Sequence, residues 1–126
     1  MFLICTVLAF FLANVASSGA LDDDVKAAFE ELNSYSGRIV WNDELAKQAL
    51  KYLKSPDSVT ANLVIKEEMT IPKDDPSSMG MKIYNSFREL FETEGTNISA
   101  LPEGSQYGCN FQSTNNEVLK IACLYN

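Results

Sequence analysis

The sequence predicts an α+β domain in which helices pack on an antiparallel sheet. Apolar side chains recur at helical spacing in three segments, near residues 23–35, 43–54 and 78–92. Segments rich in β-branched and aromatic residues alternate with them, and the last of these form a hairpin pattern between residues 107 and 125. Because helical and β-favouring segments alternate along one short chain, we expect an α-β-α sandwich or a two-layer α+β domain.

Residues 1–20 are predicted to be a secretory signal peptide. Phe2 to Val15 is almost entirely apolar but too short for a membrane span, and the small residues Ser18-Gly19-Ala20 follow it. A membrane anchor or a buried helix is the alternative for this segment. After cleavage, residues 21–126 are expected to form a single secreted, extracellular domain with one core and no membrane contact.

The limits of the second and third helices follow from their end residues. Asn42 is a good N-cap for the second helix, and Ser55-Pro56 is expected to end it. Either Ser77 or Ser78 can cap the third helix. Gly95 is expected to close it, because glycine tolerates the backbone conformation found at helix ends.

The segment between these two helices is predicted to contain one strand. Residues 59–65 (VTANLVI) are typical of a strand or a buried extended segment. Residues 69–72 are expected to form an exposed, extended connection, since Pro72 and Pro76 favour such a conformation around them.

Two of the three cysteines, Cys109 and Cys123, follow the predicted signal peptide. An even number of cysteines in a small exported chain predicts that they form a disulfide. If the two face each other across the C-terminal hairpin, side-chain alternation places two further pairs on the same side of it. These pairs are Tyr107 with Tyr125, and Phe111 with Ile121.

The composition excludes several classes of function. A formal net charge of −7 and an isoelectric point near 4.5 argue against nucleic acid or an anionic membrane as the partner. The chain has no histidine, which removes Ser-His-Asp and Cys-His catalysis and histidine-ligated zinc. Carboxylate-pair hydrolysis stays open, although the Asp and Glu side chains lie in polar runs typical of solvated surface. We therefore expect no enzyme activity, no cofactor and no metal site.

Asn97-Ile98-Ser99 is an acceptor sequence for N-glycosylation. Because the chain is expected to be exported, Asn97 is the predicted glycosylation site.

Four short segments resemble the CAP superfamily of cysteine-rich secretory, venom-allergen and plant pathogenesis-related proteins. Residues 41–46 (WNDELA) are similar to the family's W-x-x-x-L-A segment, and residues 61–63 fall where that family often has G-E-N-L. Residues 107–109 and 122–125 resemble its closing I-G-C and V-C-x-Y strands. The order is that of the family, and the likeness is greatest to short secreted nematode members. The resemblance implies a reduced, CAP-like α-β-α sandwich with a C-terminal antiparallel hairpin.

The sequence also departs from that family. Members commonly carry two histidines and two acidic residues around a cavity that can hold a metal ion. This chain has no histidine, and Ala61 stands where the first family glutamate is expected, while Glu89 matches the helix position of the second. The metal cavity is therefore not carried over, and the resemblance implies a non-catalytic binding module.

We expect the protein to act by binding an extracellular protein, peptide or lipid. The helix near 78–92 carries more aromatic side chain than one apolar stripe needs, so its candidate binding surface is Tyr84, Phe87 and Phe91. The alternative is that these residues and Ile83 all belong to the core, since a small domain needs its large side chains inside. The alternative functions are a small secreted histidine-independent hydrolase and a secreted inhibitor on another α+β fold.

Overall fold

The computed structural model describes residues 21–115 and 117–126. The predicted signal peptide, residues 1–20, lies outside the described residues. None of the helices in the described part combines the length and the hydropathy needed to cross a membrane. Its elements, in chain order, are α2 (Asp23–Leu32), β1 (Val40–Trp41), α3 (Asp43–Lys54), the 3-10 helix η1 (Pro56–Ser58), β2 (Leu63–Thr70), α4 (Met79–Ser99), β3 (Gln106–Thr114) and β4 (Val118–Tyr125).

The four strands form one mixed sheet in the order β1-β3-β4-β2. β4 lies between β3 and β2 and is antiparallel to both. β1 runs parallel to β3, with Val40 beside Gln106 and Trp41 beside Tyr107, so the prediction of a purely antiparallel sheet is wrong at this edge. The chain can pair these strands in parallel because α3, β2 and α4 form a long crossover between them.

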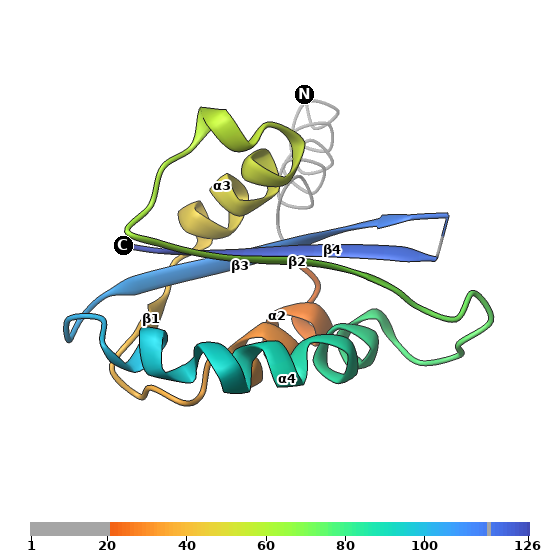
Figure 1. Ribbon diagram of the computed structural model, residues 1–126, viewed down its shortest axis with the longest axis horizontal. Helices are drawn as coiled ribbons and strands as arrows, with labels where there is room; N and C mark the ends of the chain where they lie inside the picture. The colour runs from red at the N-terminus through yellow and green to blue at the C-terminus, as the bar shows by residue number, and fades with distance from the viewer. Residues whose placement is uncertain (1–20, 116) are drawn as a thin grey trace, which may run out of the picture.

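The helices enclose the sheet from both sides. α3 covers one face, while α2 and α4 lie side by side on the other, which makes three layers (Figure 1). A small apolar cluster under α3 contains Ala49, Ala122 and Leu124. The main core lies between the sheet and the other two helices. Its buried side chains include Val25, Phe29, Leu32, Ile65, Ile83, Phe87, Phe91, Ile98, Tyr107, Leu119, Ile121 and Tyr125.

The C-terminal hairpin has the predicted register. Its opposed pairs include Cys109 with Cys123, Phe111 with Ile121 and Tyr107 with Tyr125. The two cysteine sulfur atoms are bonded at 2.05 Å, and both residues are fully buried. Five of these six side chains are buried in the main core, and the half-buried Phe111 packs against it, so α2 and α4 pack on this face of the hairpin.

The α3 helix spans the predicted residues, whereas α4 is longer than predicted. The side chain of Asn42 accepts a hydrogen bond of 3.0 Å from the N–H of Leu45, as expected of an N-cap. Helix α4 continues through Gly95 to Ser99, although Gly95 was expected to close it. The cause is Ile98, whose complete burial extends the apolar stripe of the helix by another turn.

Two further boundaries differ from the prediction. β2 runs from Leu63 to Thr70 and pairs with β4 over its whole length, so Met69 and Thr70 belong to a strand and not to a connection. Its exposed, charged outer half has no apolar alternation, because the strand lies at an edge of the sheet. Helix α2 ends at Leu32 and not near residue 35, because Asn33 turns its side chain into the core.

Candidate binding surface

Helices α2 and α4 approach closely at a glycine, and one carboxylate holds them together. A Cβ atom at Gly80 would lie 2.5 Å from the backbone oxygen of Asp24, so a larger residue would force the helices apart. The N–H of Gly80 donates a hydrogen bond of 2.8 Å to Oδ2 of Asp24, and the Ser78 hydroxyl donates one of 3.4 Å to Oδ1. The negative carboxylate thus meets the positive end of α4 and fixes the start of both helices.

Next to this contact, the two helices leave a groove of about 390 Å³ that is open to solvent. Met81 is 49% exposed beside it, and Tyr84 is half-buried. Large apolar side chains at a solvent-open groove are typical of contact surfaces. The residues that line the groove are Asp24, Ala28 and Glu31 of α2 and Gly80, Met81 and Tyr84 of α4.

Tyr35, in the turn after α2, adds an aromatic side chain farther along α4. Its side chain is 49% exposed. A Cβ atom at Gly95 would lie 3.8 Å from Cγ of Tyr35, so the ring rests against α4 where that helix has no side chain. Partial desolvation and the nearby Glu92 carboxylate raise the pKa of Tyr35, whereas the Arg88 guanidinium lowers it.

We define the α2–α4 seam as the groove with Met81, Tyr84 and Tyr35. One of the three predicted binding residues, Tyr84, lies in it. Phe87 and Phe91 are completely buried in the main core, so the prediction that they form a binding surface is wrong. Their spacing from Ile83 by four and eight residues places them on the stripe that faces the sheet.

The binding surface predicted from the sequence did not include two residues of the seam, Met81 and Tyr35. Met81 precedes Tyr84 by three residues, and this helical spacing alone would have placed both side chains on one face. The sequence pattern places Tyr35 in the first helix, whereas the structure places it in the turn that follows α2. Its position depends on the inward turn of Asn33, which the sequence pattern does not show.

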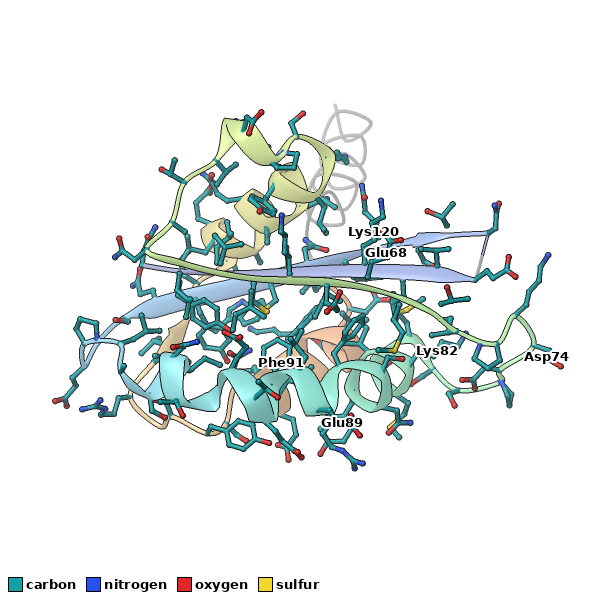
Figure 2. All side chains as sticks on the ribbon, in the orientation of Figure 1. Glu68, Asp74, Lys82, Glu89, Phe91 and Lys120 are labelled. Atoms are coloured by element: carbon teal, nitrogen blue, oxygen red, sulfur yellow. A yellow bond between two sulfur atoms is a disulfide. The ribbon has the colours of Figure 1, made fainter. Side chains whose placement is uncertain are left out.

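A second groove, of about 280 Å³, lies between α3 and the part of the sheet that α3 leaves uncovered. Its polar side chains already have partners within the protein. Nζ of Lys66 lies 5.7 Å from the ring centroid of Tyr52, and Nζ of Lys120 lies 3.5 Å from Oε1 of Glu68. Figure 2 shows Glu68 and Lys120 on the α3 side of the sheet. The apolar side chains of the α2–α4 seam are therefore the better candidate for an external partner.

A buried polar network joins α2 to the hairpin and has a structural role. Nδ2 of Asn33 donates a hydrogen bond of 2.9 Å to the backbone oxygen of Phe29 and lies 3.7 Å from Sγ of Cys109. The Tyr125 hydroxyl donates to Oδ1 of Asn33. Burial raises the pKa of the Tyr125 hydroxyl. Burial, with a smaller effect of the Glu30 carboxylate, also raises the pKa of Tyr107 to about 12. Both phenols therefore stay protonated and out of reach of a ligand.

Side chains that could ligate a metal ion are dispersed over the described part of the chain. Among residues 21–115 and 117–126, no three His, Cys, Asp or Glu side chains are grouped so that they could hold a metal ion. A general acid needs a raised pKa. At Asp75 the opposite holds, because hydrogen bonds from Ser77 lower the pKa of that carboxyl group.

Comparisons with known proteins point to secreted proteins. Residues 28–126 match the sequence model of a family described as the 15 kDa excretory/secretory protein. A 30 kDa antigenic glycoprotein of Trichostrongylus colubriformis is 26% identical over 103 residues, which are 79% of this chain and 76% of the relative. Among solved structures, the hookworm platelet inhibitor superimposes with a TM-score of 0.52 at 20% identity, over 84% of this chain and 70% of the other. The last likeness shows that the two proteins share a fold.

Proposed function

The chain belongs to the 15 kDa excretory/secretory protein family, and from that premise we propose that it acts by binding an extracellular partner protein, without catalysis. It is a secreted, extracellular protein. The hookworm protein of similar fold is described as a platelet inhibitor, and a role of that kind supports a partner outside the cell for this chain. The missing histidine and the exposed carboxylates support a role that does not depend on chemistry.

The observation that carries this proposal is the α2–α4 seam. Met81 and Tyr35 are two of four large apolar side chains that the described part of the chain leaves markedly exposed, and half-buried Tyr84 lies beside Met81 in the groove. A partner that covers them would remove apolar surface from water and gain the rigid aromatic contact that interfaces favour. Tyr84 is already held in place by its packing against the core, so little of its freedom is lost on binding.

The three-layer arrangement also supports a finer statement about the fold. We propose that it is a reduced CAP-like sandwich, in which the hairpin and the segment around Trp41 occupy the places of the corresponding CAP motifs. The pairing of β1 with β3, which brings Trp41 beside Tyr107, joins two of the segments that carry that resemblance. Superposition of an experimental structure on CAP domains tests this proposal, and a different strand order in those domains would contradict it.

A screen against extracellular proteins tests the function. Labelled protein is applied to an array of secreted proteins and receptor ectodomains, in parallel with the Tyr84→Ser variant. Tyr52→Ser serves as the matched control, because Tyr52 is a half-buried tyrosine on the opposite helical layer. We expect at least one ectodomain to bind the native protein and Tyr52→Ser, and to bind Tyr84→Ser about tenfold more weakly, as for a central aromatic contact.

Thermal melting of the same variants separates binding from folding. If Tyr84 is a contact residue, Tyr84→Ser and Tyr52→Ser should have similar melting temperatures. A large fall for Tyr84→Ser alone would show that Tyr84 acts in the core. Turnover in a hydrolase screen, or an array in which nothing binds the native protein, would contradict the proposed function.

We further propose that Asn97 is glycosylated. Its side chain is exposed in the last turn of α4, where Nδ2 donates a hydrogen bond of 3.1 Å to Oε1 of Glu94. The glycan would project from the end of the helix near the turn to β3. Protein secreted from eukaryotic cells should lose apparent mass on treatment with an N-glycosidase, and Asn97→Gln should remove this difference. An unchanged mass would contradict the assignment.

A further inference from the structure

The two helical layers of the domain differ in charge. Helices α2 and α4 carry seven Asp and Glu side chains against three Lys and Arg, a net charge of −4. Helix α3 carries two acidic against three basic side chains, a net charge of +1. The negative charge of the protein is therefore concentrated on the layer that contains the α2–α4 seam. Figure 2 shows one of these carboxylates, Glu89, on the outer side of α4.

The charges next to the seam are mostly negative as well. Asp24 and Glu31 line the groove, and Glu92 influences Tyr35 at the other end. Arg88 is the basic group that influences Tyr35. The other two cations of this layer are Lys26, whose Nζ lies 5.5 Å from the centroid of the Trp41 ring beside β1, and Lys82, whose charge acts on the Asp75 carboxyl ahead of α4.

The exposed apolar side chains occupy a length of α4 that suits one segment of a partner. Met81 and Gly95, where the ring of Tyr35 rests, are 14 residues apart in one helix. At 1.5 Å per residue, they are about 21 Å apart along the axis, which is the length of an amphipathic helix of about four turns. Grooves between helices bind such segments through apolar anchors on one face.

We infer that the α2–α4 seam binds a basic, amphipathic segment of its extracellular partner protein. The apolar side of the segment contacts Met81, Tyr84 and Tyr35, and its lysines or arginines face Glu31 and Glu92. Opposite charge at the rim speeds encounter and selects the partner, while the apolar contacts retain it. The same negative charge disfavours a second copy of this chain and an anionic membrane on this face. This inference rests on the proposed function and specifies the partner.

Defined peptides test the charge of the partner. The probe is a labelled synthetic amphipathic helix of about 15 residues, matched to the length of the seam, with leucines on one face and lysines on the other. Its twin has glutamate in place of every lysine. We expect the lysine peptide to bind the full domain about tenfold more tightly than its twin, and its affinity to fall as salt is raised. Amide chemical-shift changes should concentrate in α2 and α4.

Matched charge reversals test the location. Glu31→Lys with Glu92→Lys should weaken binding of the lysine peptide about tenfold. Glu44→Lys with Asp57→Lys makes the same change in net charge at exposed positions of α3 and η1, and should change binding less than about twofold. Circular dichroism establishes that both double variants are folded, and the single Glu92→Lys variant replaces the first pair if it is not.

Several results would overturn the inference. If both double variants weaken binding of the lysine peptide equally, the peptide is attracted by net charge alone. If the amide chemical-shift changes fall on α3, the binding site lies elsewhere. Equal binding of the two peptides would show that charge does not select the partner. A partner protein from the array could lose binding to the Tyr84→Ser variant and yet bind independently of salt and of Glu31→Lys. That result would leave the proposed function in place and would refute only the inference that the partner segment is basic.

Discussion

Replacing Gly108 with alanine should push helix α3 away from the sheet. A Cβ atom at Gly108 would lie 2.2 Å from the backbone nitrogen of Ala46, 2.5 Å from the carbonyl carbon of Leu45 and 2.7 Å from the backbone oxygen of Asn42. These atoms form the first turn of α3, and no side-chain rotation can move them. The first turn must shift, which also disturbs the Asn42 cap and the hydrogen bond of 3.1 Å from the Asn110 side chain to the Ala46 oxygen.

The expected loss of stability is at least that of an overpacked core. Overpacking costs about 1–3 kcal/mol, and disturbance of a helix cap costs about 1 kcal/mol more. In a domain of this size, each kcal/mol lowers the melting temperature by roughly 4–8 °C. Gly37→Ala is the matched control, because a Cβ atom there meets nothing within 4 Å and its φ is not in the left-handed region.

Urea and thermal unfolding followed by circular dichroism measure both variants. Gly37→Ala should leave stability unchanged or raise it by up to about 1 kcal/mol, because alanine restricts the unfolded chain. If Gly108→Ala melts together with Gly37→Ala, the close packing of α3 on β3 is wrong, and so is the three-layer arrangement that depends on it.

Three further predictions concern the main core. Asn33→Ala should lower the free energy of unfolding by about 1–3 kcal/mol, because it leaves the buried Tyr125 hydroxyl without its acceptor. Urea titration measures this change. A loss below about 0.5 kcal/mol, which is the usual effect of a surface substitution, would contradict the prediction. Removal of the Cys109–Cys123 disulfide should cost about 2–4 kcal/mol, and mass spectrometry of the unreduced secreted protein should show the link; two free thiols would refute it. Since burial raises the pKa of Tyr107 to about 12, the stability that its neutral form provides is present below pH 10 and is lost as the pH rises toward 12. The tyrosinate absorbance that Tyr107 contributes should therefore rise together with unfolding, and full ionisation of all five tyrosines in folded protein would contradict this.

Local features made part of this fold predictable from the sequence. Helix α3 was placed correctly because Asn42 and Pro56 mark its two ends, and both act within one turn. The register of the hairpin followed from Cys109 and Cys123, since one fixed pair determines every other pair in an antiparallel ladder. In both cases, the residues that decide the structure lie close together in the chain.

The features that escaped prediction depend on contacts between distant segments. The parallel pairing of β1 with β3 joins two residues to a strand more than 60 positions later, and so short a strand has no periodicity. The seam was only partly predicted for the same reason. The predicted binding surface included Tyr84 correctly. Whether Phe87 faces the sheet or the solvent depends on which side of α4 packs inward, and the sequence of the helix alone does not decide this. Tyr35 lies in the turn that follows Asn33, and the side chain of Asn33 accepts a hydrogen bond from Tyr125, 92 residues away.

The central place of β4 has a consequence for how the protein is made. β2 and β3 do not pair with each other, and each is hydrogen-bonded to β4 along its length. Until residues 118–125 have been synthesised, the upstream strands lack the neighbour that joins them, and the main core lacks one wall. We therefore expect the domain to complete its folding only after β4 has been made. Because Cys123 lies in β4, the disulfide with Cys109 can also close only once that last strand has been made.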